Sequence, residues 1–473
     1  MAAVGWRIVQ PVIVFELNEV PWRIVDWWTE HHPDSELASL LATSSQWTSV
    51  SPDEGHLSPW VTWPTVHRGV PNTVHGIGHF GQDTDHADEV APTWWSRAVD
   101  AGRRVGVFGL LHTNELPDDV GRYAFFVPDT FAPSADTHPD DLEPFQAFNL
   151  SMARASARNV STGIDVAAAR RFLQRAPRLG LRPATVLRLV RQLVDERRHP
   201  HTRVRRRSYQ SVLAFDLFLR QVRDTRPDAS AFFTNHVASA MHRYWAATFP
   251  EDYDPDTFGF DATWISTWDG EIAEAMGHAD RMIGRLRSHC DATGSVLVIA
   301  SSMGQQAAQG TPVGRQLYLR DVDAFVRDAG IDPAAVERRP AMDPHVNVQV
   351  SDAAVADFRA RMTALRVGGS EVTWTEEEDG FFSLEFGQAD EAIGDLTVDA
   401  EVRDPESLGF EIVEIEDEVA STGYHVPEGI LVRYDPRPGA VVDTSRSAVT
   451  TTDIAPMILD ALDVPTGERA AGQ

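Results

Sequence analysis

Short apolar runs, separated by segments with helical periodicity, constrain the fold of this 473-residue chain more than any other feature. Each run has the length of one buried strand, and the later ones follow segments whose apolar residues recur at helical spacing. The clearest runs are residues 11–17, 105–111, 231–234 and 296–300. Alternating strands and helices predict a mostly parallel sheet covered by helices on both faces, which is a three-layer α/β sandwich.

Polar side chains follow three of these runs within one or two residues. They are Asn18, Asn235 and Ser302. In open parallel sheets, ligands bind at the carboxyl ends of the strands. We therefore predict that these three residues line a pocket and contact the substrate.

Composition narrows the functional class. The net charge of −28 argues against binding of nucleic acid by the whole molecule. Cys290 is the only cysteine, so neither an intramolecular disulfide nor a cysteine-based zinc cluster is expected. The first ten residues lack the pattern of a signal peptide, and no apolar run has the length of a membrane span. We expect a soluble, cytoplasmic protein; nothing in the sequence indicates an oligomeric state.

Two stretches interrupt the alternation and predict insertions. Residues 151–207 contain 15 arginines and three acidic residues, a local charge of +12, and are expected to be helical. Residues 311–420 mix a helix at 353–365 with alternating strands, and 376–379 form a predicted hairpin tip, which together indicate a small α+β cap. The predicted α/β core comprises residues 8–150, 208–310 and 421–467.

The arginine-rich insertion has two interpretations. Five aliphatic residues lie at helical spacing among its arginines: Val186, Leu187, Val190, Leu193 and Val194. In the first interpretation, the arginines pair with the acidic body of the protein. In the second, the segment makes peripheral contact with an anionic membrane or a polyanionic substrate.

Several sequence blocks occur in a fixed order along the chain. They are residues 16–19 (ELNE), 63–65 (WPT), 75–77 (HGI), 235–242, 301–304 (SSMG), 423–430 (GYHVPEGI) and 451–459 (TTDIAPMIL). In this order they resemble the alkaline phosphatase superfamily, and most of all its type I phosphodiesterase/nucleotide pyrophosphatase branch. The resemblance implies an alkaline phosphatase-like α/β core that hydrolyses a phosphate ester, phosphodiester or nucleotide-linked substrate.

The resemblance also implies two divalent cations, usually zinc, held by carboxylates and imidazoles. This chain departs from that ligand set. The first-strand aspartate of the family falls on Asn18, its Asp-x-x-x-His pair on Ala238 and His242, and its Asp-His-Gly on residues 302–304. The last histidine is matched by His425. Because two desolvated dications without anionic ligands would be very unfavourable, a two-metal site is not expected.

One divalent cation is a simpler expectation. His242 and His425, joined by Glu19, could hold zinc or manganese and leave one position open to water. A metal-free alternative uses an imidazole such as that of His242 as a general base, with Arg243 or Arg68 stabilising phosphate charge.

The nucleophile is assigned by spacing within the resemblance. The family's Thr or Ser precedes a glycine, here Gly69, by about ten residues, and gapless spacing leads to Pro59 with Ser58 beside it. A three-residue deletion leads to Thr62, whose Thr-aromatic-Pro context is common for such nucleophiles. We favour Thr62 and keep Ser58 as the alternative. The predicted substrate-binding residues are Asn18, His75, Asn235, Arg243 and Ser302.

These observations support two functional hypotheses. The first is a hydrolase-like protein that acts on a small phosphorylated substrate with a remodelled site. The second is a catalytically inactive or diverged member that binds a phosphorylated glycan or nucleotide, or serves as a partner subunit. Loss of metal ligands favours the second hypothesis, and the imidazoles near strand ends favour the first.

Overall fold

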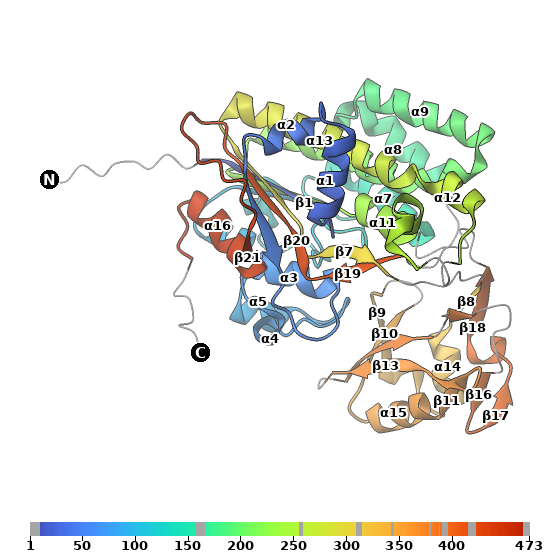
Figure 1. Cartoon of the computed structure of the whole chain (residues 1–473). Coiled ribbons are helices and arrows are strands. Elements are labelled where there is room, and N and C mark those ends of the chain that lie inside the picture. The colour runs from blue at the N-terminus through green and yellow to red at the C-terminus, as the bar shows by residue number, and fades with distance from the viewer. Residues whose placement is uncertain are drawn as a thin grey trace.

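A computed structural model gives the structure of most of the chain. It describes residues 10–156, 166–254, 259–308, 315–341, 345–377, 380–386, 388–389, 396–414 and 422–466. Figure 1 shows a large helix-covered sheet joined to a smaller lobe built mainly of strands.

An eight-stranded sheet forms the centre of the larger lobe. From edge to edge its strands are β21 (Ser447–Thr450), β2 (Ser45–Val50), β20 (Glu428–Tyr434), β6 (Val296–Ala300), β1 (Val12–Leu17), β5 (Ala229–Thr234), β3 (Val105–Phe108) and β4 (Phe125–Val127). β20 is antiparallel to both of its neighbours, and the other pairs are parallel. Each of the four apolar runs contains one central strand, as the sequence predicts.

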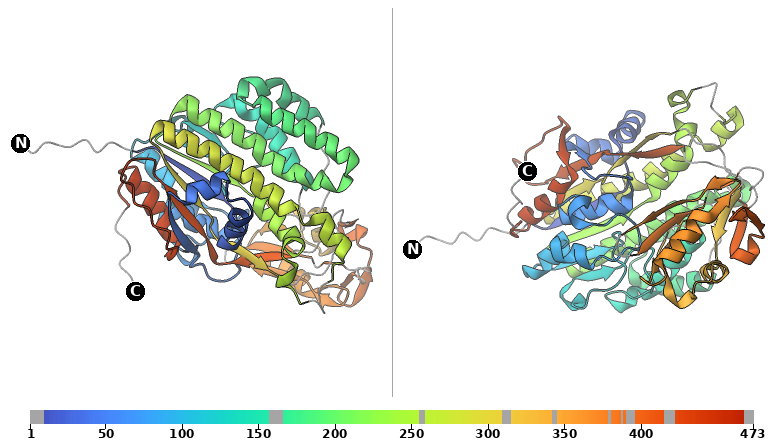
Figure 2. Two further views of the ribbon diagram at one scale, coloured as in Figure 1. Left: turned by 45° about the horizontal axis from the view of Figure 1, so that its top comes forward. Right: turned by 90° about the horizontal axis from the view of Figure 1, so that it is seen from below.

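Alternate residues of β1 pack into two separate cores. Phe15 belongs to one core, which contains residues of α1 (Trp22–His31), α2 (Glu36–Leu41), α7 (Glu143–Ser156), α10 (Arg206–Thr225), α11 (His236–Thr248) and α13 (Glu271–Thr293). Val14 belongs to the other, with α3 (Pro59–Arg68), α6 (Trp94–Asp100) and α16 (Ile454–Ala461). Figure 2 shows the long helices lying side by side over the sheet. Helices on both faces confirm the predicted three-layer fold.

The arginine-rich segment is helical where it is described. It contains α8 (Val166–Leu179), α9 (Pro183–Arg198) and the 3-10 helix η3 (Pro200–Arg205). Its predicted first residue, at 151, falls inside α7, because the helix that starts at 143 runs on to 156.

The smaller lobe has its own apolar core beneath three small sheets. The sheets are β13–β14–β10–β9, β12–β11–β16–β17 and β15–β8–β18. The strands are β8 (Arg315–Leu319), β9 (Val336–Arg339), β10 (Val346–Val350), β11 (Leu365–Val367), β12 (Ser370–Glu371), β13 (Thr373–Glu376), β14 (Phe381–Glu385), β15 (Gln388–Ala389), β16 (Leu396–Val398), β17 (Glu401–Arg403) and β18 (Phe410–Glu414), with helices α14 (Val322–Asp328) and α15 (Val355–Ala364). We refer to residues 315–414 as the cap. The predicted hairpin tip joins β13 to β14, and residues 378–379 of it lie outside the described residues.

A two-stranded ribbon, β7 (Gly304–Ala307) with β19 (Gly423–Val426), stands where the chain leaves the core for the cap and returns. In its register Gln305 lies opposite His425.

The cap packs against the core loop between α4 (Asn72–His75) and α5 (Asp85–Val90). His79 lies 3.0 Å from a carboxylate oxygen of Glu377, and the Arg339 guanidinium donates to the carbonyl of Gly81 at 3.1 Å. The other short elements are α12 (Ala262–Trp268), η1 (Val120–Arg122), η2 (Asp140–Leu142), η4 (Pro250–Asp252), η5 (Pro333–Ala335), η6 (Glu406–Leu408) and η7 (Thr451–Asp453). In the described part of the chain, no helix combines the length and apolarity needed to cross a membrane.

Candidate functional site

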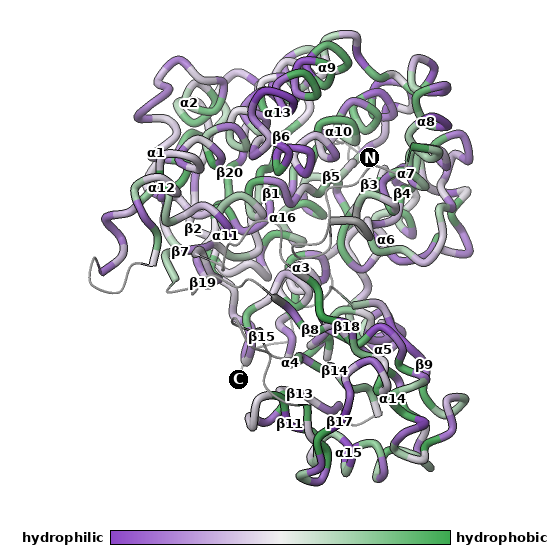
Figure 3. Tube along the Cα trace, turned by 90° about the vertical axis from the view of Figure 1, so that its right-hand side faces the viewer, coloured by the Kyte–Doolittle hydropathy of each residue, from purple (hydrophilic) through white to green (hydrophobic). Residues whose placement is uncertain are grey.

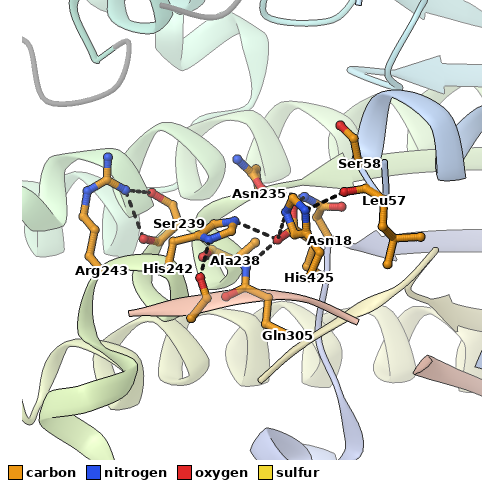
Figure 4. Close-up of polar contacts among 12 residues, drawn as sticks. Asn18, Leu57, Ser58, Asn235, Ala238, Ser239, His242, Arg243, Gln305 and His425 are labelled. Atoms are coloured by element: carbon orange, nitrogen blue, oxygen red, sulfur yellow. Dashed lines mark hydrogen bonds and ion pairs between the residues drawn. The ribbon is translucent and has the colours of Figure 1, made fainter. Parts of the chain in front are cut away.

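Polar residues from three parts of the chain converge at the carboxyl end of the central strands. Asn18 and Glu19 follow β1, and His242 lies on the helix that follows the neighbouring strand β5. His425 comes from the ribbon strand β19. Figure 4 shows Asn18, His242 and His425 gathered around one point. The prediction that working groups gather after the strand ends is consistent with this arrangement.

Glu19 adopts a backbone conformation that is rare for its residue type. Its φ angle is +59°, in the left-handed region, and its side chain is buried. Such a conformation costs about 1 kcal/mol or more and persists only where the surroundings enforce it. Here the conformation directs a carboxylate inward at the end of β1 rather than leaving it in water at the start of α1.

The Glu19 carboxylate is the centre of the cluster. Its Oε2 lies 2.9 Å from Nε2 of His242 and 3.3 Å from Nε2 of His425. The Gln305 amide donates a short hydrogen bond to the same oxygen. Oε1 accepts a 2.7 Å hydrogen bond from the Asn18 amide. We call Glu19, His242 and His425 the Glu19 triad.

Two backbone carbonyls set the orientation of the triad imidazoles. Nδ1 of His242 donates to the carbonyl of Gly423 at 2.8 Å, and Nδ1 of His425 donates to the carbonyl of Leu57 at 2.8 Å. A carbonyl can only accept, so each Nδ1 carries the proton. In the neutral rings both Nε2 lone pairs therefore point at one carboxylate oxygen. That arrangement is repulsive unless protons or a cation lie between these atoms.

Charge in the triad follows from burial and the imidazoles. Burial by itself would raise the pKa of the Glu19 carboxyl, but attraction to His425 and His242, with hydrogen bonds from both, lowers it well below its usual value. The carboxylate is thus ionised at neutral pH. The centre consequently favours positive charge, either as imidazolium protons or as a bound cation.

The donor set fits a divalent cation. The three ligand atoms lie within 4.8 Å of one another, and within the described residues the triad is the one such group of three or more His, Cys, Asp or Glu. In a tetrahedral zinc site with bonds of about 2.1 Å, ligand atoms lie roughly 3.4 Å apart, close to the separations from Glu19 Oε2. Fixing an imidazole through Nδ1–H is also how metal-ligating histidines are held. His242 is partly exposed, so water can reach the open side.

Asn18, by contrast, has every polar atom occupied within the protein. Its Oδ1 accepts from the indole of Trp63, and its Nδ2 donates to Glu19 and to Asn235 Oδ1, each at 2.7 Å. The indole N–H is only a donor, so it fixes which end of the amide is oxygen. We call Asn18, Trp63 and Asn235 the Asn18 network. Asn18 therefore orients the triad carboxylate, and Trp63 holds its oxygen in place.

Three further positions at which the resemblance implies metal ligands are buried in this chain. Ala238 and Met303 are fully buried, and the carbonyl of Ala238 accepts from Gln305 at 3.3 Å. The buried hydroxyl of Ser302 accepts a 2.8 Å hydrogen bond from Thr62.

The two candidate nucleophiles occupy different environments. Thr62 lies within α3, fully buried and paired with Ser302, so the structure does not present its hydroxyl to a substrate. Ser58 is the N-cap of the same helix and is partly exposed. It follows Leu57, whose carbonyl holds His425.

The other predicted substrate-binding residues lie apart from the triad or at its edge. His75 is buried, accepts from the backbone N–H of Ile77 and donates to Thr65; burial, with Arg68 and His112, lowers its pKa to about 3. It therefore stays neutral and orders the loop after α4.

Asn235 precedes α11, and Arg243 lies within it. Asn235 is the exposed N-cap of the helix and joins the Asn18 network. The guanidinium of Arg243 turns back one helical turn to the hydroxyl and carbonyl of Ser239, at 2.7 and 3.0 Å. Figure 4 shows it pointing away from the triad.

Aromatic side chains frame the exposed side of the triad. The ring of Tyr424, which is partly exposed, has its centroid 4.6 Å from that of His425 and 6.4 Å from that of His242. The imidazole of His56 is a further neighbour of the Tyr424 ring, with 6.5 Å between centroids.

Three participants were not predicted from the sequence. Gln305 was missed because its role depends on the register of the ribbon, which places it opposite His425. The carbonyls of Leu57 and Gly423 carry no side-chain signal at all. Gln305 could have been suspected, since it directly follows the block at 301–304.

Comparison with known proteins gives structural matches only. No protein-family model matches the chain, and no curated protein matches it in sequence. Phosphonoacetate hydrolase from Sinorhizobium meliloti 1021, solved with phosphonoformate, is 16% identical over 96% of each chain, with a TM-score of 0.40. Murine ectonucleotide pyrophosphatase/phosphodiesterase 5 is 10% identical over 98% of each chain, with a TM-score of 0.41. An inactive form of the murine protein has been solved with AMP.

The second of these names is that of the branch which the motif blocks resemble. Because the identities and TM-scores are this low, we take the fold from the strand order and the site from its own contacts.

Proposed function

We propose that this protein is hydrolase-like, holds one divalent cation in the Glu19 triad and acts on a phosphate ester, phosphodiester or nucleotide-linked substrate. The observation that carries the proposal is the convergence of two Nε2 atoms on one carboxylate oxygen, with both Nδ1 atoms bonded to backbone carbonyls. Zinc and manganese both accept this mixture of imidazole and carboxylate ligands.

A substrate would approach the triad from its exposed side, next to His242. When bound there, a divalent cation supplies a Lewis acid for a phosphoryl oxygen. Glu19 offsets part of its charge, and the Gly423 and Leu57 carbonyls keep both imidazoles in the ligating orientation. Asn18 and Gln305 hold the carboxylate in place through its two oxygens.

Ser58 is the better-placed nucleophile in this proposal. Its hydroxyl lies at the N-terminus of α3, where the helix dipole favours a phosphate. It also directly follows the residue whose carbonyl holds His425. Thr62, one turn further along, is sealed in the core by its bond to Ser302.

Elemental analysis of the purified, dialysed protein tests the metal. We expect about one zinc or manganese per chain, lost in His425→Ala and retained in His86→Ala, which changes an exposed histidine elsewhere. No metal in the unmodified protein would overturn this part of the proposal.

A phosphoester screen of the metal-loaded protein tests the reaction. With a chromogenic phosphodiester such as bis(p-nitrophenyl) phosphate, Ser58→Ala should abolish turnover and Thr62→Val should leave it nearly unchanged. The reverse result would restore Thr62 as the nucleophile.

The second candidate is a binding protein without turnover. The Asn18 network and the buried Ala238 and Met303 favour it, since they supply no charged ligand where the resemblance implies one. Stoichiometric metal with no hydrolysis of any ester, combined with saturable binding of AMP or a sugar phosphate in calorimetry, would select this candidate.

A further inference from the structure

Helix α9 has the reverse of the usual arrangement for a surface helix. Its inward side buries the polar residues Thr185, Gln192 and Glu196. Its outward side exposes aliphatic residues: Val186 40%, Leu187 50%, Val190 50%, Leu193 37% and Val194 42%. At 100° per residue these five fall within about one third of the helix circumference, so they form a continuous apolar stripe.

The buried polar side is fully engaged and explains why the helix lies this way round. Gln192 donates to Glu196 at 3.1 Å and to the carbonyl of Thr202 at 2.8 Å. Arg206, on α10, binds the carboxylate of Glu196 through Nε at 2.9 Å and Nη2 at 2.6 Å. These bonds anchor α9 to η3 and α10, and they leave the apolar stripe to solvent.

Arginines border the stripe. Arg182 lies at one side of it, Arg191 and Arg198 lie at the other, and Arg197 falls on it near the helix end; all four are exposed. Neither acidic residue of α9 faces outward freely, because Glu196 is buried and Asp195, at the border, bonds His199 at 3.0 Å. The neighbouring helix α8 adds further exposed side chains, namely Arg170, Arg171, Leu173, Arg175 and Arg178.

The stripe also lies where a flat surface could reach it. Figures 1 and 3 place α9 at the outer edge of the molecule, away from the cap. Segment 151–207 carries a charge of +12 and the rest of the chain −40, which together give the net charge of −28. Opposite charges thus occupy different parts of one molecule, which orients it in an electric field.

We propose that α9 is a docking helix for an anionic phospholipid surface. Its aliphatic stripe enters the boundary between headgroups and acyl chains, and Arg182, Arg191, Arg197 and Arg198 contact the phosphates. A symmetric pair of copies fits this face less well, because it would set two rows of arginines against each other. The inference is independent of the function proposed for the triad.

Vesicle co-sedimentation of the full chain tests the proposal. We expect binding to vesicles of phosphatidylglycerol and phosphatidylcholine in equal parts, weakened by salt, and none to phosphatidylcholine alone. The triple variant of Arg191, Arg197 and Arg198 to Gln should bind on the order of 100-fold more weakly. A control variant of Arg327, Arg338 and Arg403 to Gln removes the same charge from the cap and should bind like the unmodified protein.

A second set of variants tests the apolar stripe. Leu187, Val190 and Leu193 changed together to Asn should abolish binding, whereas Val402→Asn, at an exposed cap residue, should not. A fluorophore on Val190→Cys should shift to the blue with anionic vesicles, since Cys290 is buried and stays unlabelled.

Three outcomes would overturn the inference. One is that the unmodified protein does not sediment with anionic vesicles even at low salt. Another is that the cap control loses binding as much as the α9 variant, which would make the attraction a matter of net charge. The last is a concentration-dependent dimer, abolished by the stripe variant, in a protein that ignores vesicles; the stripe would then join two copies of the chain.

Discussion

The Glu19 triad and the Asn18 network lie side by side at the same strand ends, yet they are built on opposite principles. In the triad, three ligand atoms point at one another and their charge is not balanced by the protein. In the network, each amide atom of Asn18 has a partner of the right polarity. A cluster with unbalanced charge favours binding of a cation, whereas a cluster with satisfied hydrogen bonds does not. The two clusters therefore differ in their charge balance although they share the same strand ends.

The strongest challenge to this comparison is to give the network a charge. In Asn18→Asp, two donated hydrogen bonds are lost and a second carboxylate is placed beside Glu19. We expect the free energy of unfolding at pH 7 to fall by about 3 kcal/mol, and the loss to shrink in acid as the new carboxyl takes a proton. Chemical denaturation at pH 7 and pH 5 measures it.

Metal stoichiometry of the same variant sharpens the comparison. Ala238, Ser302 and Met303 supply no further ligand, so the metal content should stay near one per chain. Two metals per chain in Asn18→Asp would show that a single added carboxylate is enough to create a second metal site.

A smaller effect is expected from the support of the triad. Gln305→Leu removes the amide that donates to Glu19 and should weaken metal affinity by about 10- to 100-fold. Gln306→Leu, at the exposed neighbour, is the matched control. Competition with a chelator of known affinity gives both values, and equal affinities would remove Gln305 from the site.

The buried His236, outside the triad, should make the stability of the protein depend on pH without any metal. Burial, with His278 nearby, lowers the pKa of His236 to about 3, so the folded protein keeps this ring neutral while the unfolded chain binds a proton below about pH 6.5. Its contribution to stability is therefore lost as pH falls from about 6.5 towards 3. In His236→Gln, the slope of unfolding free energy between pH 6 and 5 should fall by about 1.4 kcal/mol per pH unit. Urea titrations at several pH values report it, and an unchanged slope would contradict the assignment.

The smallest effect concerns the buried hydrogen bond between Thr62 and Ser302. Thr62→Val keeps the shape of the side chain and removes its hydrogen bond to Ser302, which should reduce stability by about 1 kcal/mol. Thermal unfolding measures this. If Thr62→Val also changed metal affinity, the Thr62–Ser302 pair would be coupled to the Glu19 triad more closely than their contacts indicate.

The sequence predicted the layers of the fold well, because apolar runs and helical periodicity report burial directly. It also named all three triad residues, since each stands in a recognisable block. It could not locate what orients them. The carbonyls of Leu57 and Gly423 are invisible to any side-chain pattern, and the pairing of Gln305 with Glu19 depends on strand register.

The ranking of Thr62 over Ser58 came from its Thr-aromatic-Pro context together with an assumed three-residue deletion, and neither reports exposure. A gap of three residues moves a position by almost one helical turn, from the exposed end of α3 into its buried side. The structure separates the two hydroxyls by environment, which the alignment of short motifs could not do.

The β7–β19 ribbon has a mechanical consequence. Every covalent path between core and cap runs through its two strands, one leaving from Ala307 and the other arriving at Gly423. The same strands carry Gln305, His425 and the carbonyl that fixes His242. The strands that connect the cap to the core also position the triad. A displacement of the cap relative to the core therefore acts directly on the positions of Gln305 and His425.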